Sequence, residues 1–216
     1  MSNNILLLCG LAIVVALILG GFVARRRNLP CPAWLRWFVE LDNPFFPNAR
    51  AKAIVQHLDL QPGMRVLDVG CGPGRVTIPL AEKVGTQGRV VAIDLQSKML
   101  RRVEEKARQA QLNNISFRQI KVGEGQFDFT QFDRAVLVCV LGEIPSREAA
   151  FREIFHALKP GGILSVTEVI ADPHFQGQNT VRKLGTAVEF HEKGLFGNRF
   201  SFSLLLEKPR TGNDAS

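Results

Sequence analysis

The chain has 216 residues, a length that suits one domain with a short extension, and 46% of them are hydrophobic, which is enough for a buried core. Its formal net charge is +7, but apart from Arg25-Arg26-Arg27 the basic residues are scattered and no basic run alternates with aromatic residues, which argues against nucleic-acid binding. The four cysteines, Cys9, Cys31, Cys71 and Cys139, form no CxxC pair, and no histidine stands at metal-ligand spacing. The sequence therefore predicts neither a disulfide framework nor a metal site, and it fits a reducing compartment.

The first predicted element is an uncharged apolar run from Ile5 to Val23. As a helix these residues would span roughly 28 Å, close to the thickness of the hydrocarbon core of a bilayer. A cleaved signal peptide would carry positive charge before the run, whereas residues 1–4 have none and the arginine cluster follows it. We therefore expect a single-pass membrane anchor over residues 1–28, with everything after it in the cytoplasm by the positive-inside rule.

Residues 29–47 predict a linker rich in proline and aromatic residues. Aromatic rings favour the headgroup region, so the linker either lies on the membrane surface or packs against the soluble domain, and the sequence leaves both readings open. Its prolines argue against one continuous helix. The aromatic residues are Trp34, Trp37, Phe38, Phe45 and Phe46, and the prolines are Pro30, Pro32, Pro44 and Pro47.

From Ala49 onward, predicted strands and helices alternate. Short apolar runs with β-branched residues indicate strands, and segments of helical periodicity lie between them. Strands that are apolar on both faces predict a mostly parallel sheet covered on two sides. The predicted strands are 65–69, 89–95, 115–120, 132–141 and 163–170, and the predicted helices are 50–58, 74–84, 97–111 (with Ser97 as its N-cap) and 146–158.

After the fifth strand the pattern changes. A short helix is predicted at 180–184, followed by strands at 188–192 and 200–208 with no helix between them, which indicates an antiparallel hairpin at the sheet edge. The fold class predicted for residues 48–208 is therefore α/β: a Rossmann-like, doubly wound, mostly parallel seven-stranded sheet with a C-terminal antiparallel hairpin. One transmembrane helix precedes it, and residues 209–216 are predicted to be a disordered tail.

The stretch VLDVGCGPGR, residues 66–75, joins the first strand to a helix through a glycine-rich turn. Such a turn exposes backbone N–H groups at a helix N-terminus and lets a ligand come close. A dinucleotide fold wants G-x-G-x-x-G, but the sixth position is Arg75, and the G-K-[ST] of a P-loop is absent. Asp94, at the end of the second strand, could accept hydrogen bonds from both hydroxyls of a ribose. A ligand with one nucleoside and no pyrophosphate, such as S-adenosylmethionine, suits this site.

Four segments in order resemble the motifs of class I S-adenosylmethionine-dependent methyltransferases. VLDVGCGPGR resembles the first motif and VVAIDLQSKML the second, with its ribose-binding acid. FDRAVLVCVLGEI resembles the strand that ends beside the transferred methyl, and REIFHALKPGGILSVTE resembles the later helix, turn and fifth strand. The resemblance covers about residues 48–208 and is nearest to the small-molecule, quinone and arsenite-type members. The placement of the cysteines weakens the arsenite reading.

The resemblance implies roles for the residues of the glycine turn and its two acids. Gly70, Gly72 and Gly74 let the loop pass under the methionine part of the cofactor. Asp68 orients that loop or holds the amino group, and Asp94 takes the ribose hydroxyls. As acids on otherwise apolar strands, Asp68 and Asp94 are hard to explain as core residues, which favours a functional role.

On the adenine side the resemblance implies that Leu95 and Met99 flank the ring, although both could also be plain core residues. Many relatives place an acid after the third strand, where it meets the adenine amino group. Here that region is the short segment KVGEGQFDFTQFD, in which Glu124 is the nearest candidate and Asp128 the next. The residue that contacts adenine therefore stays open.

On the side of the transferred methyl, Cys139 and Val140 at the end of the fourth strand would line the sulfonium. A buried cysteine that acts only as a small hydrophobe is the alternative for Cys139. A general base is needed only if the acceptor must lose a proton. Glu143 and His174 are the candidates for it, followed by Asp172, and ordinary helix-approach or solvated-loop roles compete with these assignments.

The predicted function is methyl transfer from S-adenosylmethionine to a small or lipid-like acceptor at the membrane surface, with residues 5–23 holding an open cleft against the bilayer. A non-catalytic module that binds a membrane partner is the alternative. A nucleotide-sugar or NAD-linked enzyme is disfavoured by Arg75 and by the terminal hairpin. The acceptor and the oligomeric state stay open.

Overall fold

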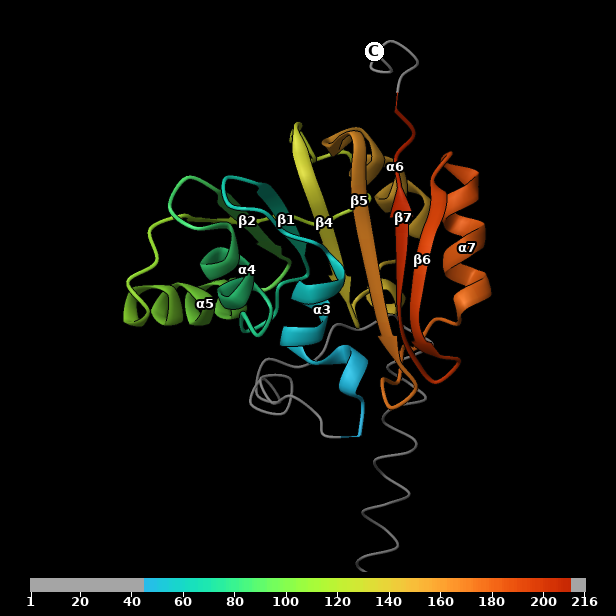
Figure 1. Cartoon of the computed structure of the whole chain (residues 1–216), viewed down its shortest axis with the longest axis horizontal. Helices are drawn as coiled ribbons and strands as arrows, with labels where there is room; N and C mark the ends of the chain where they lie inside the picture. The colour runs from blue at the N-terminus through green and yellow to red at the C-terminus, as the bar shows by residue number, and fades with distance from the viewer. Residues whose placement is uncertain (1–44, 211–216) are drawn as a thin grey trace, which may run out of the picture.

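A seven-stranded sheet runs through residues 45–210, the part of the chain that the computed structural model describes (Figure 1). Its strand order is β3-β2-β1-β4-β5-β7-β6, and the neighbours among β1 to β5 are parallel, whereas β7 is antiparallel to both β5 and β6. The predicted mostly parallel sheet with a C-terminal hairpin is confirmed. The strands are β1 (Arg65–Val69), β2 (Arg89–Asp94), β3 (Ile115–Gln119), β4 (Phe132–Val138), β5 (Leu158–Val169), β6 (His191–Asn198) and β7 (Ser201–Glu207).

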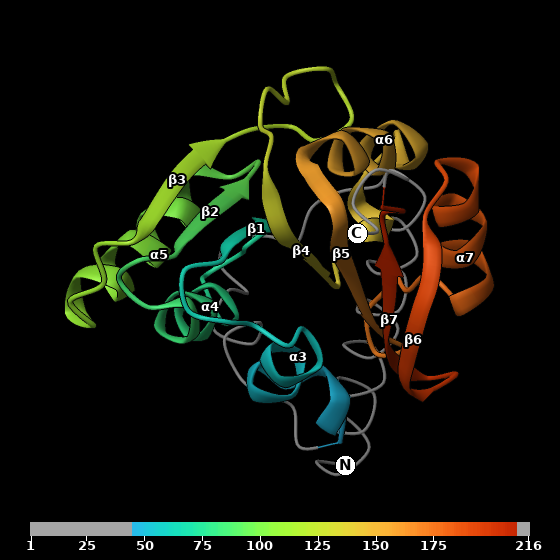
Figure 2. The same ribbon diagram turned by 45° about the horizontal axis from the view of Figure 1, so that its top comes forward.

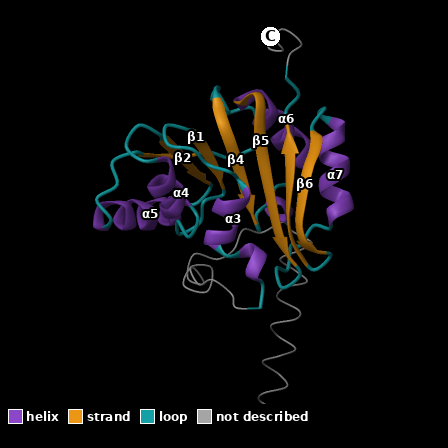
Figure 3. Cartoon of the chain, in the orientation of Figure 1, coloured by secondary structure: helices purple, strands orange, loops and turns teal. Residues whose placement is uncertain are grey.

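Helices cover both faces of this sheet (Figure 3). One face packs against α3 (Ala51–His57), α4 (Thr77–Val84) and α5 (Ser97–Gln109), and the other against α6 (Arg147–Ala157) and α7 (Gln178–Ala187). Two short 3-10 turns complete the described elements: η2 (Pro47–Ala49), where the described chain begins, and η3 (Leu141–Glu143), directly after β4.

The strands are apolar on both sides because both faces are covered. Along β1, Val66 packs with α3 and α4, whereas its neighbour Leu67 belongs to the larger core under α6 and α7. In β4, Val136 likewise packs into the core beneath α3 and α4, and Leu137 packs into the core under α6 and α7. Successive side chains of a strand thus point into two separate cores. Because both faces are buried, these strands appear in the sequence as continuous apolar runs.

Several element boundaries differ from the prediction. The helix expected from Gly74 begins at Thr77, because residues 70–76 form the glycine turn instead. Ser97 is the first residue of its helix rather than the N-cap, a position held by Gln96. The fifth strand begins at Leu158, five residues early, with a register shift against β4. The last helix extends to Ala187, and β6 follows at His191 because Val188 and Phe190 are buried in the core.

Between β3 and β4 the chain crosses without a helix (Figure 2). Backbone N–H groups of Gly123 and Gly125 donate to the carboxylate of Glu153 on α6, at 2.6 and 2.7 Å. Side chains of the same loop pack against the core beneath α6: Ile120, Val122, Phe127 and Phe129. In this crossing, the loop itself covers the core beside α6, held in place by Glu153, whereas helices cover the rest of the sheet.

Within residues 45–210 no helix is long and apolar enough to cross a bilayer. The predicted anchor over residues 1–28, most of the linker over 29–47, and residues 211–216 of the predicted tail lie outside the described residues.

Candidate cofactor and acceptor site

The predicted site residues other than Glu124 lie near the point where the parallel strands end, at one edge of the sheet that we call the carboxyl edge. Parallel strands point the same way, so the ends of β1, β2, β4 and β5 meet there, as Figure 1 shows. The glycine turn follows β1, Asp94 closes β2, and η3 follows β4. The site has two halves: a cofactor half at β1 and β2, and an acceptor half at β4 and β5.

The glycine turn is held tightly to β2. The N–H groups of Gly70 and Cys71 both donate to the carbonyl of Ile93, at 2.8 and 3.0 Å. Asp94 uses both carboxylate oxygens on backbone, accepting from Gly72 N–H at 2.9 Å and from Gln96 N–H at 2.7 Å. Asp94 therefore fixes both the loop before α4 and the start of α5, while each of its oxygens keeps a lone pair for a ligand hydroxyl.

At two positions of the turn only glycine fits, because a side chain would clash with a neighbouring residue. Gly70 and Gly74 have φ of +68° and +84°, and a Cβ on Gly70 would lie 2.4 Å from Cγ2 of Val140. A Cβ on Gly74 would lie 2.8 Å from Cγ1 of Val103 on α5. The turn thus touches both the loop after β4 and the helix after β2, and it brings Val140 against the first glycine.

Asp68 is 2% exposed and accepts a 2.6 Å hydrogen bond from the hydroxyl of Thr77, the first residue of α4. Burial raises the pKa of Asp68 to about 6, and the nearby charge of Asp94 adds to this, while the Thr77 hydrogen bond opposes it. Burial also raises the pKa of Asp94. Two close buried carboxyl groups of raised pKa favour a cationic ligand, because positive charge relieves the cost of ionising them.

The adenine-side candidates separate in the structure. Leu95 is 43% exposed directly after Asp94, so its side chain is free to contact a flat ring, whereas Met99 is 3% exposed and belongs to the packed face of α5. Glu124 is exposed and forms an ion pair with Lys121 in the loop that Glu153 holds against α6. Asp128 is also exposed. The structure thus does not bring Glu124 into the group formed by Asp68, Asp94 and the glycine turn.

The acceptor half is built around η3. Arg147, at the start of α6, donates from its guanidinium to the carbonyls of Leu141 and Gly142, at 3.1 and 3.0 Å. A Cβ on Gly142 would lie 1.9 Å from the carbonyl oxygen of His174, so only a glycine lets the loop after β5 lie against η3. This close approach brings Glu143 and His174, the two predicted candidates for a base, onto adjoining segments.

Cys139 marks the point where β4 ends. It is partly buried and has a φ of +53°, a strained value for a residue with a side chain, and its N–H donates to the carbonyl of Thr167 at 2.9 Å. Burial raises the pKa of the Cys139 thiol, and the charges of Glu168 and Asp172 add to that effect. Cys139 therefore stays a neutral thiol, which fits a wall of the site and not a nucleophile.

The loop after β5 holds Asp172 and His174 close together. The Oδ1 atom of Asp172 accepts from the backbone N–H of His174 at 2.6 Å and lies 3.9 Å from its Nδ1. His174 is 6% exposed, and its Nε2 has no hydrogen-bond partner among the described residues. Asp172 orients the segment, and within residues 45–210 the second ring nitrogen, Nε2, has no partner.

Glu168 is the residue that the sequence prediction missed. It stands near the end of β5, is 1% exposed, and accepts at Oε2 from the N–H of Gln176 at 3.0 Å, while its Oε1 is unpartnered within residues 45–210. Burial raises its pKa to about 8, with Asp172 and Glu143 adding to the rise and Arg147 opposing it. Its signal in the sequence was an acid in an apolar strand, which is the criterion that found Asp68 and Asp94.

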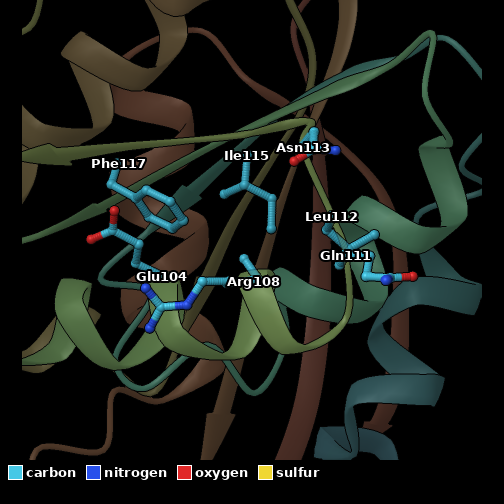
Figure 4. Close-up of a pocket in the computed structure, with 8 residues that line it drawn as sticks. Glu104, Arg108, Gln111, Leu112, Asn113, Ile115 and Phe117 are labelled. Atoms are coloured by element: carbon cyan, nitrogen blue, oxygen red, sulfur yellow. The ribbon is translucent and has the colours of Figure 1, made fainter.

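One groove of about 650 Å³ lies elsewhere, between α5 and β3 at the end of the sheet (Figure 4). None of its lining residues belongs to either half of the site, and it opens along the edge strand. We therefore assign the chemistry to the carboxyl edge and not to this groove. The lining residues are Glu104, Ala107, Arg108, Gln111, Leu112, Asn113, Ile115 and Phe117.

Comparison with known proteins identifies the family of this chain. The profile of a family described as "Methyltransferase domain" matches residues 60–196, more than half of the chain. The chain belongs to this methyltransferase family. A SAM-dependent methyltransferase from Aquifex aeolicus shares the fold with a TM-score of 0.72 at 18% identity, over 82% of this chain and 99% of that one. One from Methanosarcina mazei has a TM-score of 0.60 at 22% identity, over 73% and 98%.

Among curated relatives of this methyltransferase domain are demethylmenaquinone methyltransferases. That of Listeria welshimeri is 31% identical over 130 residues, which are 60% of this chain and 55% of the relative. That of Bacillus cereus is 33% identical over 111 residues, 51% of this chain and 47% of the relative. The chain thus spans about half the length of the curated relatives it matches.

The residues of the cofactor half fit S-adenosylmethionine, the cofactor of this methyltransferase family. The glycine turn allows close backbone approach, and Leu95 offers an exposed apolar surface beside Asp94. Asp94 keeps free lone pairs for ribose hydroxyls, and the pair Asp68 and Asp94 suits a molecule that carries positive charge. The fit therefore rests on observations at four points of this half of the site.

Proposed function

We propose that this chain transfers a methyl group from S-adenosylmethionine to a lipid-like acceptor of the quinol type at a membrane surface. The observation that carries the proposal is the junction of the two halves: Val140, two residues after β4, packs on Gly70 of the cofactor turn, and the acceptor half begins at the next residues. The relatives named for demethylmenaquinone support the acceptor class. The apolar run Ile5–Val23 supports the membrane location.

The cofactor supplies an electrophilic methyl group on a sulfonium, so the chain mainly provides orientation, dry surroundings and a place for a proton. Gly70, Gly72 and Gly74 would let the backbone pass close under the cofactor, and Asp94 would accept from its ribose. Asp68 would hold the turn in place through Thr77 at the start of α4. Cys139 and Val140 would form an uncharged wall beside the reacting carbon.

The proton that a hydroxyl-bearing acceptor loses must go to a group of this chain or to water. His174 is the better candidate for this base, because its Nε2 lacks a partner among the described residues and Asp172 fixes its backbone from the other side. Glu143 is the second candidate, on the segment that lies against His174. The attacking atom, oxygen or ring carbon, depends on the acceptor.

The test is a transfer assay with the full chain and methyl-labelled S-adenosylmethionine, offered a membrane lipid extract or water-soluble acceptors. We expect label in the lipid fraction, lost in Asp94→Asn and reduced when residues 1–28 are removed. Equal turnover of soluble acceptors with no labelled lipid would contradict the proposal. Binding of S-adenosylhomocysteine without any transfer would favour the non-catalytic module, and competition by NAD would favour the nucleotide-linked alternative.

A further inference from the structure

Exposed large hydrophobic side chains are confined to one side of the described molecule. Within residues 45–210 each of them lies at the carboxyl edge or in the last four residues of a strand that ends there. Leu95 belongs to the predicted adenine surface, so a bound cofactor accounts for it. The other five have no such explanation: Phe45, Ile170, Leu195, Phe196 and Phe200.

Four of these residues form what we call the carboxyl-edge patch: Phe45, Ile170, Phe196 and Phe200. Ile170 follows β5 and its N–H donates to the carbonyl of Phe200, in the β6–β7 turn, at 2.7 Å. Ile170 is 49% exposed and Phe200 44%. Phe196 stacks on His57 of α3 with 3.9 Å between ring centroids, and the guanidinium of Arg199 lies 4.6 Å from the ring centre of Phe200.

The N-terminal chain joins the fold beside this patch. A Cβ on Gly197 would lie 2.9 Å from Nδ2 of Asn48, and the Ser203 hydroxyl donates to the carbonyl of Asn48 at 3.5 Å, so η2 lies against the β6–β7 hairpin. Two residues before η2, Phe45 is 84% exposed. Figure 1 shows the η2–α3 segment on the same side as the arrowhead of β5 and the β6–β7 turn.

We propose that the carboxyl-edge patch rests on the surface of a phospholipid bilayer with anionic headgroups, so that the acceptor half of the site faces the lipid. The inference rests on the proposed function, specifically on membrane attachment through Ile5–Val23. Phe45, Ile170, Phe196 and Phe200 sit at the headgroup level, and Arg199 meets the headgroup charge. The acceptor then reaches the site without passing through water.

The choice of a bilayer over a protein partner follows from what precedes the patch in the chain. The 44 residues before Phe45 carry a run of bilayer length at Ile5–Val23 and the cluster Arg25-Arg26-Arg27, which suits an anionic surface. A chain tethered in this way reaches the fold at η2, beside the patch. The tether and the patch thus lie on the same side of the described molecule, which is the side that we place against the membrane.

The orientation can be measured with the full chain in vesicles of phosphatidylcholine and phosphatidylglycerol whose acyl chains carry bromine. In a background with Trp34→Phe and Trp37→Phe, Phe200→Trp places one indole in the patch, and Gln87→Trp places one in the exposed turn before β2, at the opposite edge. We expect the fluorescence of Phe200→Trp to fall at least about twofold, since interfacial side chains reach the acyl boundary, and that of Gln87→Trp to stay unchanged.

Quenching at Gln87→Trp, or none at Phe200→Trp on vesicles that carry the protein, overturns the proposed orientation. A chain that does not associate with vesicles overturns it together with the anchor. Both readouts are independent of methyl transfer. A failure of the proposed activity therefore shows separately, as unlabelled lipid alongside normal quenching at Phe200→Trp.

A second measurement links the patch to turnover. Ile170→Ser with Phe200→Ser should lower the methylation of a bilayer-embedded acceptor about tenfold, because apolar contact with the lipid is lost, and should leave the affinity for S-adenosylhomocysteine unchanged. Phe200→Leu, which keeps an apolar side chain, should retain most of the rate. Equal rates for the double serine variant and the parent chain would contradict the proposal.

Discussion

The cofactor half and the acceptor half of the site differ in how completely their polar atoms are paired. At β1 and β2 the buried acids have partners: Thr77 donates to Asp68, and two backbone N–H groups donate to Asp94. At β5 and the loop after it, one oxygen of Glu168 and Nε2 of His174 are buried without a partner among the described residues. Leaving a buried polar atom without a partner costs stability, so Oε1 of Glu168 and Nε2 of His174 are the atoms of this half that an acceptor would satisfy.

This difference indicates that the chain builds its two ligand sites in different ways. The cofactor half is preorganised by the backbone itself, with the glycine turn bonded to Ile93 and Asp94. The acceptor half has buried polar atoms without partners among the described residues, and a strained residue, Cys139, directly after β4. One cofactor shared by a family suits a fixed cradle, and an acceptor particular to one protein suits groups that only that acceptor satisfies.

The largest effect is expected from Asp94→Asn. Both carboxylate oxygens accept from backbone N–H groups, so an amide places its NH₂ against Gly72 or Gln96 and loses one of these bonds. We expect S-adenosylhomocysteine to bind about 100-fold more weakly, equivalent to roughly 3 kcal/mol, by isothermal titration calorimetry. Asp59→Asn is the control, since Asp59 is exposed and its φ of +46° suits asparagine. Unchanged affinity in Asp94→Asn would remove Asp94 from the site.

Gly70→Ala tests the contact between the two halves. The new Cβ would lie 2.4 Å from Val140, in addition to the cost of a φ of +68°, so we expect the free energy of unfolding to fall by about 2–3 kcal/mol. Gly125→Ala has a similar φ, +74°, with no atom within 4 Å of the new Cβ, and should lose only about 1 kcal/mol. Urea unfolding of both variants measures the difference. Equal losses would mean that φ, and not the approach of Val140, decides the cost.

Glu168→Gln should change how stability depends on pH. The folded chain keeps this proton up to about pH 8, whereas the unfolded chain releases it near 4.5, so the free energy of unfolding of the parent falls as pH rises through this window. The variant lacks that fall and should gain roughly 2 kcal/mol relative to the parent between pH 6.5 and pH 8.5. Glu192→Gln, at the surface with a lowered pKa, should show a constant difference over the same range. A constant difference for Glu168→Gln as well would show that this carboxyl is ionised in the folded chain.

The smallest effect is expected from Leu95→Ser. Its side chain is 43% exposed after β2, so its loss should weaken S-adenosylhomocysteine binding by about 3–10-fold, the value of a small apolar contact, without lowering stability. Leu195→Ser, at a similarly exposed leucine on β6, should leave the affinity unchanged. If Leu95→Ser binds like the parent, the adenine lies elsewhere, and the loop around Glu124 becomes the next region to search.

Local sequence patterns predicted the order of strands and helices, and they placed Asp68, Asp94 and the turn glycines at the ends of β1 and β2. Strand apolarity, the turn glycines and the acids at the ends of β1 and β2 are readable from neighbouring residues. The acceptor half depends on contacts between distant segments, such as Gly142 against His174 and Arg147 against η3, which no short pattern contains. Element boundaries moved for the same reason: Val188 and Phe190 read as a strand because they are apolar, but they are buried in the core before β6 begins.

Arg75, directly after the last turn glycine, donates from its guanidinium to the carbonyl of Ala49 in η2 at 2.7 Å. This bond joins the glycine turn to η2, where the described chain enters the fold. Thermodynamic linkage then applies in both directions. If filling the cofactor site strengthens the hold of the domain on a bilayer by some factor, docking on the bilayer must strengthen cofactor binding by that same factor.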